Sequence, residues 1–219
     1  MTQLLLDDRL APITSDIGFL ETDVETAVAA YLEWQDHIRI RHTRVTVEGT
    51  LEDLLSRLLP LQAGAKTRSL WVPTVGGWTA YFDNGSDGPD PFPPMSFLAG
   101  QLGRQGLRAA AVVDTMDEQT RRGRYGASIL EVYGSLQEDG SNTVRSICGA
   151  HDGDRWTFEA FGEVLPFENP SRYEARRAQD RFPIELLDDY LHALGVHAFD
   201  SAFYAPDRRA VLLERRRRF

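Results

Sequence analysis

Apolar residues recur with the period of an α-helix in three stretches of the chain. In the first stretch the apolar positions form one stripe of a helix surface, and Thr22 with Glu25 matches a capping box. Thr50 and Asp53 match the same arrangement ahead of a leucine-rich stripe that Pro60 ends. The pattern predicts helices over Val24–Leu32, Leu51–Leu59 and Pro183–Leu194, and shorter patterns predict helices near Pro94–Leu102 and over Asn169–Gln179.

Alternation of apolar and polar residues, interrupted by turn-forming clusters, predicts strands elsewhere in the chain. Arg68–Val75 and Trp78–Asp83 predict a hairpin that turns at Gly76 and Gly77. Short connections after Leu107 favour an antiparallel meander. Its predicted strands are Leu107–Asp114, Gly126–Tyr133, Thr143–Cys148 and Asp154–Phe161, and the remaining strands are Arg41–Glu48, Phe199–Tyr204 and Ala210–Glu214.

These elements predict an α+β fold, with a largely antiparallel sheet and helices on one of its faces. Residues 1–18 show no sustained period and are expected to lie over the surface as a loosely packed lead-in. A chain of 219 residues is long enough to bury about 70% of its unfolded surface. We therefore expect a single domain over residues 1–219.

Two stretches, beginning at Trp78 and at Trp156, share an order of motifs. Both contain Trp-Thr, then Phe-Pro, then Leu-Gly, which predicts a strand, a connection and a helix in each. An internal pseudo-repeat would divide the chain into similar halves of about residues 19–115 and 116–219, with the two tryptophans at comparable strand positions. Coincidence is the alternative, because the spacing of the motifs differs between the stretches.

The composition is that of an ordinary folded domain, with 42% hydrophobic and 26% charged residues. No stretch approaches the roughly 18 apolar residues of a membrane-spanning helix. The first residues, M-T-Q-L-L-L-D-D, lack the basic region of a signal peptide. One cysteine, Cys148, leaves no partner for an internal disulfide. We expect a cytoplasmic protein that does not associate with membranes.

The net charge of -9 argues against a general nucleic-acid binder, because neutralising phosphates requires a clustered basic surface. The one basic run, Arg215–Arg218, is expected to be a solvated end of the chain. An acidic protein instead attracts basic partners through its long-range field.

Candidate metal and nucleophile sites are incomplete. Asp83–Gly88 resembles the start of a calcium loop, but its third position is glycine and its twelfth is Pro94 rather than glutamate, so we expect no bound metal. Cys148 and His151 are three residues apart, which places them on opposite faces of a strand. A thiol activated by this histidine is therefore not expected.

Three carboxylates, Glu159, Glu163 and Glu168, surround a predicted connection between a strand and a helix. Two carboxyl groups with separated pKa values could act as acid and base, whereas ion pairs with nearby arginines are the simpler interpretation. Neither a phosphate-binding glycine loop nor a nucleophile elbow occurs in the sequence. We expect no catalytic residue and no cofactor, and an enzyme remains an open alternative.

Three motifs follow one another between Gly76 and Gly134: G-W-T-A-Y-F-D, then, after a helix ending L-G, L-R-A-A-A-V-V-D and R-Y-G-A-S-I-L-E-V-Y-G. In this order they resemble small uncharacterised actinobacterial α+β proteins, some of them proposed as immunity proteins for polymorphic toxins. The later R-W-T-F-E-A-F-G is a looser second part of the resemblance. The resemblance implies a stoichiometric protein-binding role and carries no set of functional residues.

Two functions from different classes are consistent with the sequence. The first is a non-catalytic protein-binding protein, immunity-like and directed at a basic partner. The second is an enzyme or small-molecule binder with a cleft lined by aromatic residues and carboxylates. For the first, the loop before Pro94 is the expected contact surface, because prolines restrict the unbound loop and acidic residues surround an aromatic one. Its candidate binding residues are Asp83, Asp87, Asp90 and Phe92.

Overall fold

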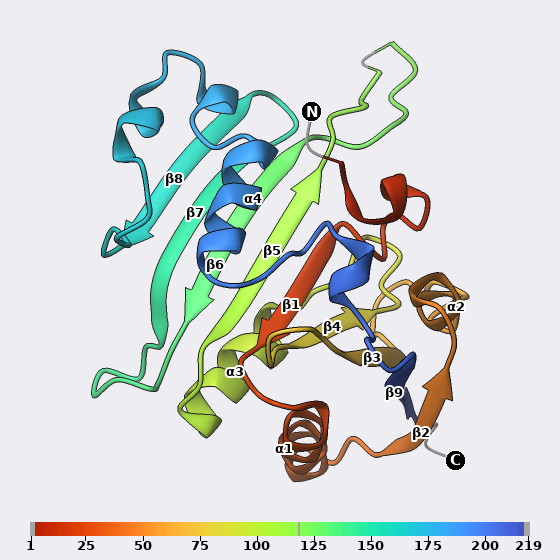
Figure 1. Cartoon of the computed structure of the whole chain (residues 1–219). Helices are drawn as coiled ribbons and strands as arrows, with labels where there is room; N and C mark the ends of the chain where they lie inside the picture. Colours follow the sequence, from red (N-terminus) through yellow and green to blue (C-terminus); the bar gives the residue numbers. More distant parts are fainter. Residues whose placement is uncertain (1–2, 118, 217–219) are drawn as a thin grey trace.

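One antiparallel sheet runs through the molecule and joins strands that are far apart in the sequence (Figure 1). The computed structural model describes residues 3–117 and 119–216, so Arg217 and Arg218 of the basic run lie outside the described residues. The strand order is β2-β9-β3-β4-β1-β5-β6-β7-β8. The strands are β1 (Asp16–Leu20), β2 (His42–Glu48), β3 (Arg68–Pro73), β4 (Thr79–Asp83), β5 (Gly106–Val112), β6 (Ala127–Tyr133), β7 (Thr143–His151), β8 (Trp156–Gly162) and β9 (Arg209–Arg215).

Four α-helices and four short 3-10 helices of the described chain accompany the sheet, so the predicted α+β class is confirmed. The α-helices are α1 (Val24–His37), α2 (Leu51–Ser56), α3 (Phe92–Leu102) and α4 (Ile184–Ala193), and the 3-10 helices are η1 (Leu5–Asp8), η2 (Pro170–Glu174), η3 (Ala178–Asp180) and η4 (Ser201–Phe203). The predicted hairpin and meander are confirmed, because β3 pairs with β4 and β5 through β8 pair in succession.

The N-terminal segment is the main correction to the sequence-based prediction. Residues 1–18 were expected on the surface, but β1 lies in the middle of the sheet between β4 and β5, and all five of its residues are buried. Burial on both faces removes the alternation by which a strand is recognised in a sequence. Gly18 permits this position, because a Cβ there would come within 2.7 Å of Met95 Cγ on α3.

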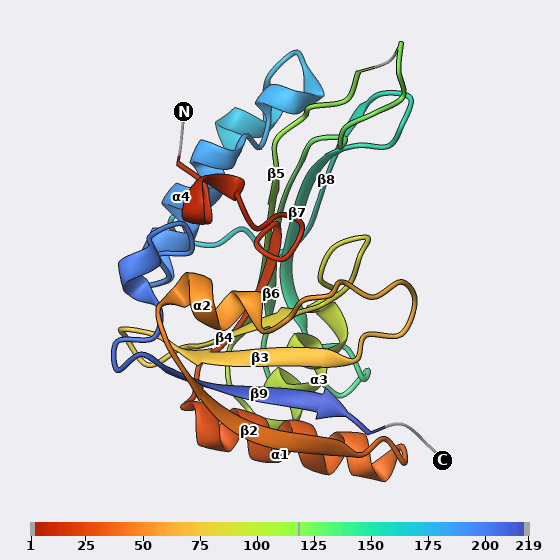
Figure 2. The ribbon, with the colours of Figure 1, turned by 90° about the vertical axis from the view of Figure 1, so that its right-hand side faces the viewer.

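Helices cover both faces of the sheet, not one face as predicted. α2 and α4 pack on one face with Phe19, Phe82 and Leu130, while α1 and α3 pack on the other with Trp71 and Tyr133. Figure 2 shows α1 below β2, and α2 and α4 above β3. The strands also turn along the sheet, so that β2, β9 and β3 run across the direction of β5, β6, β7 and β8 (Figure 2). This twist follows from the handedness of the strands.

Two predicted elements have a different structure. In the first, a side chain provides a hydrogen-bond partner for a backbone N–H group. Residues 169–179 form η2 and η3 rather than one helix, and the Asn169 N–H donates to the Tyr190 hydroxyl at 2.7 Å. Within residues 199–204, Ser201–Phe203 form η4 rather than a strand. Phe203 and the following Tyr204 are in the core, where the Phe203 ring lies against Phe19. The aromatic residues therefore belong to a packed turn here.

Two helix starts test the predicted capping residues. Thr50 and Asp53 form the predicted capping box ahead of α2. At α1 the cap is Asp23 rather than Thr22, since the Asp23 carboxylate accepts a hydrogen bond from the Thr26 N–H. The Thr22 carbonyl instead accepts a hydrogen bond of 2.7 Å from the Thr79 hydroxyl, which ties the start of α1 to β4.

The two stretches of the predicted repeat differ in strand direction and in helix placement. Five successive antiparallel pairings separate β4 from β8, so the two strands run in opposite directions. The helices that follow them, α3 and α4, pack on opposite faces of the sheet. Trp78 precedes β4 and is buried, whereas Trp156 begins β8 and is half-buried.

Candidate functional site

The face of β5, β6, β7 and β8 opposite α4 is only partly covered, because α3 on this face packs against β1, β5 and β6. Side chains on it are arranged in rows set by the strand register. One row contains Asp16, Ala110, Ile129, Cys148 and Glu159, and the next contains Gly18, Arg108, Glu131, Ser146 and Phe161. We call the residues of these rows that belong to β5 through β8 the open face. Glu159 and Phe161, at its margin on β8, are exposed.

A charged network lies where the open face meets β1. Arg108 donates to Asp16 through Nε and Nη2, at 3.0 and 2.7 Å from Oδ2, and its Nη1 lies 3.1 Å from Glu131 Oε2. The Tyr133 hydroxyl donates to the same Glu131 oxygen at 2.6 Å. Two carboxylates therefore share one guanidinium. With all three groups ionised the network carries one excess negative charge.

The excess charge affects the titration of the network. Burial raises the pKa of Asp16 from 3.8 to about 6, although Arg108 acts to lower it. Glu131 adds to the rise because a second negative charge disfavours ionisation. Burial acts to lower the pKa of Arg108, but its bonds with both carboxylates outweigh that effect and raise it. The guanidinium therefore stays charged, and burial, with a smaller contribution from Glu131, disfavours ionisation of Asp16.

A groove of about 470 Å³ opens over this network. Its floor includes Asp16, Arg108 and Ile129, and its walls come from the loop at Asp87 and from the β5–β6 connection at Arg124. Arg124 is paired with Asp8 and donates to the Ser15 hydroxyl at 2.8 Å. The charged residues that line the groove are Asp16, Asp87, Arg108 and Arg124, and the carboxylates of Glu131 and Asp8, which pair with the two arginines, make the charge of the whole site negative. We call this site the acidic groove.

The four sequence-predicted binding residues do not form one exposed surface. Asp83 is buried, which corrects the expectation that it faces a partner; it accepts hydrogen bonds from the N–H groups of Gly85 and Asp90 at 2.9 and 3.0 Å. Burial raises the pKa of Asp83, and these N–H donors partly oppose the rise. The carboxylate of Asp83 therefore organises its own loop.

The other three predicted residues lie at the surface in different settings. Asp90 is exposed and pairs with Lys66 at 3.2 Å. Phe92 is 45% exposed, with its ring centroid 5.9 Å from that of Tyr133. Asp87 is exposed and lines the acidic groove. Of the four, Asp87 thus lines the acidic groove, and Phe92 contacts Tyr133 of the charged network.

The other candidates from the sequence do not assemble into a catalytic group. Cys148 lies on the open face, and burial together with the charge of Glu131 raises its pKa. His151 stacks instead on Tyr125, with ring centroids 4.6 Å apart. Glu168 is buried in an ion pair with Arg145, whereas Glu159 is exposed on the open face. Among the described residues no group of three or more His, Cys, Asp or Glu side chains could hold a metal ion.

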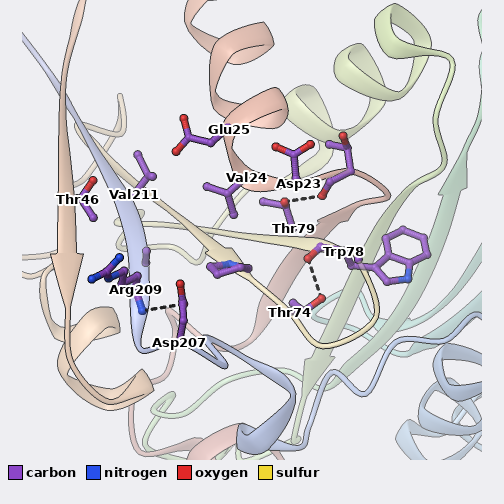
Figure 3. Close-up of a pocket in the computed structure, with 14 residues that line it drawn as sticks. Asp23, Val24, Glu25, Thr46, Thr74, Trp78, Thr79, Asp207, Arg209 and Val211 are labelled. Carbon is purple, nitrogen blue, oxygen red and sulfur yellow. Dashed lines mark hydrogen bonds between the residues drawn. The ribbon is translucent and has the colours of Figure 1, made fainter.

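Figure 3 shows a second pocket, of about 480 Å³, between the start of α1 and the ends of β3, β4 and β9. Trp78, Asp23 and Asp207 are among its lining residues. Its polar groups are largely engaged in local structure, since Asp23 caps α1 and Asp207 accepts a hydrogen bond from the Arg209 N–H at 3.1 Å. The pocket is an aromatic and acidic cleft of the kind expected for the alternative function, without an arrangement that indicates a reaction.

No known protein family, curated protein or solved structure matches this chain. Within residues 3–117 and 119–216, no helix has both the length and the apolar character needed to cross a membrane.

Proposed function

We propose that this protein is a non-catalytic protein-binding protein that engages a basic partner at the acidic groove. One observation carries the proposal. Asp16 and Glu131 share the single Arg108 guanidinium, and a groove on a partly uncovered sheet face lies over this network. A lysine or arginine of a partner that enters the groove supplies the missing positive charge. Asp87 lies in the wall as a further acceptor.

The surroundings of the network favour a protein over a small ion. Ile129 and Cys148 are half-buried on the open face beside the charges, and Phe161 is 69% exposed at its margin. Interfaces combine an apolar centre with a polar rim in this way. The net charge of -9 speeds encounter with a basic protein, so salt should weaken association mainly through its rate.

The biological form of the proposal is a stoichiometric, immunity-like role in the cytoplasm. The resemblance of residues 76–134 to immunity-type proteins supports it, and so does a single cysteine, which suits a reducing compartment. A secreted or injected nuclease is a basic partner of the required kind, because enzymes that bind nucleic acid carry clustered cations.

Affinity capture from a lysate of the source cells tests the proposal, at about 50 mM and about 500 mM salt. The double change Asp87→Asn/Glu131→Gln should strongly reduce recovery of a basic protein that the wild type retains at low salt. The matched control is Glu33→Gln/Glu174→Gln, which removes the same charge from exposed positions outside the groove. Equal recovery with both double variants would exclude the groove as the binding site.

The second candidate function is small-molecule binding in the pocket of Figure 3. Its volume of about 480 Å³ lies in the range of ligand sites, and Trp78 in its wall provides a fluorescence signal. A compound that changes this fluorescence saturably, and does so less well after Asp207→Asn, would favour this function. Binding of a basic protein that is unaffected by such a compound favours the first.

A further inference from the structure

We infer that the partner contributes an extended segment that pairs with the outer edge of β8, with a basic side chain opposite Glu159. This inference rests on the proposed function and extends the contact from the acidic groove to the edge of the same sheet. β8 is the last strand of the sheet, and no described strand pairs with its outer side. Unpaired backbone groups on such an edge are a template for another strand.

The backbone groups that point outward can be identified from the register. His151 donates its N–H to the Gly126 carbonyl, on the β6 side of β7. In an antiparallel pair the hydrogen-bonded and non-bonded positions alternate, so Trp156 opposite His151, and then Phe158 and Ala160, turn their N–H and C=O groups to the outer edge. The end of the edge is closed, because the Gly162 carbonyl accepts a hydrogen bond of 2.9 Å from Arg145 Nη1.

The side chains of β8 indicate which kind of strand fits. Glu159 is the single charged residue among Trp156–Gly162 and projects on the same face as Phe161. A cross-strand lysine or arginine pairs favourably with Glu159, and an apolar residue covers Phe161. Glu159 stands at the centre of β8, so symmetric antiparallel pairing with a second copy of this chain would place two glutamates opposite each other. Like charges in that position disfavour a dimer through β8.

The open face connects this edge to the acidic groove. Glu159 and Asp16 are the two ends of one row, with Ala110, Ile129 and Cys148 between them. A strand added beside β8 extends this row past Glu159, on the side away from Asp16. A single basic partner can therefore occupy both sites, with its strand at the edge and a cationic side chain in the groove.

Selection from a displayed library of random peptides of about twelve residues tests this inference. Wild-type protein should enrich peptides that alternate β-branched residues with lysine or arginine. Ala160→Pro removes one outward N–H without removing a bond to β7, and it should weaken binding of the enriched peptides about tenfold. Thr46→Pro is the matched control on the other sheet edge. Register with β9, where Gly49 donates to Arg208, turns the Thr46 N–H outward in the same way.

Two further measurements separate edge pairing from groove binding. Glu159→Lys should abolish selection of basic peptides and favour acidic ones, and this change does not alter the backbone. Hydrogen exchange of the wild type should show slower exchange of the Phe158 and Ala160 amides when an enriched peptide is bound. Equal binding to wild type and Ala160→Pro, with loss only in Asp87→Asn/Glu131→Gln, would overturn the edge inference and leave the proposed function standing. Failure to enrich any basic peptide would overturn both.

Discussion

Asp16 and Arg108 join β1 to β5 through two hydrogen bonds to Asp16 Oδ2, of 2.7 and 3.0 Å, although the residues are 92 positions apart in the chain. Asp16 lies in a central strand whose residues are all buried. Because Arg108 also pairs with Glu131, its single positive charge is shared between two carboxylates. A carboxylate in this position is costly to the isolated protein and useful for binding a cation.

The pH dependence of stability should reveal this cost. The folded pKa of Asp16, about 6, exceeds its usual 3.8, so the folded protein binds more protons than the unfolded chain between these values. Stability therefore falls as pH rises through this window. The Asp16→Asn variant lacks this fall, and its stability relative to wild type should increase from pH 4 to pH 7 by at most about 3 kcal/mol.

Urea unfolding of both proteins at several pH values measures that difference. Asp189→Asn, at an exposed position on α4, is the control and should follow the wild type at every pH. A constant difference between Asp16→Asn and the wild type across this range would show that Asp16 is ionised in the folded protein well below pH 6.

The close contact between β1 and α3 predicts that one added methyl group at Gly18 lowers the stability of the protein. Gly18→Ala places a Cβ 2.7 Å from Met95 Cγ and 2.8 Å from Pro91 Cβ, so α3 has to move away from the sheet. Overpacking of this kind costs about 1–3 kcal/mol. Gly100→Ala, within α3 and with its nearest contact at 3.4 Å, is the comparison and should be neutral or slightly stabilising. Chemical denaturation of the two variants measures these changes in the free energy of unfolding.

The ion pair between Arg145 and Glu168 is a second buried charge site, with side chains 4% and 0% exposed. Arg145→Met leaves the Glu168 carboxylate buried without its cation and should destabilise the protein by about 3–5 kcal/mol. Adding Glu168→Gln removes the charge but keeps an acceptor for the Tyr173 hydroxyl, which lies 2.6 Å from Glu168 Oε2. The double variant should therefore recover much of the loss. Equal unfolding free energies for the single and double variants would show that packing, not charge, is the cause.

Cys148 should behave as an unreactive thiol. Burial and the charge of Glu131 raise its pKa above the usual 9.0, so little thiolate is present near neutral pH. Alkylation by iodoacetamide at pH 7.5 should be much slower in the folded protein than in urea. Equal alkylation rates in the folded protein and in urea would contradict this prediction.

Much of the fold could be predicted from local patterns, because the hairpin, the meander and three helices depend on short-range periodicity. β1 could not, since a strand buried on both faces shows no alternation, and Asp16 beside Gly18 is typical of a loop. Trp-Thr and Phe-Pro describe a local sequence order, whereas strand direction and the sheet face that a helix covers are set by the whole sheet, so these motifs could not predict either.

The candidate site was only partly accessible from the sequence. Asp87 was identified from its loop, but Asp83 was grouped with it because burial of a carboxylate by its own loop has no distinct sequence signal. Arg108 and Glu131 were missed, although each stands on a predicted strand among apolar residues, in L-R-A-A-A and I-L-E-V-Y. A charged residue in such a setting needs a partner, and that requirement could have directed attention to them.

The position of β9 affects how the chain folds as it is made. Residues 209–215 lie between β2 and β3, which are formed by residues 42–48 and 68–73. At about 5–20 residues per second, roughly 7–30 s of translation separate the end of β3 from the start of β9. Throughout that time β2 and β3 have been synthesised, but β9, the strand that lies between them in the sheet, has not. A ribosome-associated chaperone that shields these edges should therefore increase the yield of native protein.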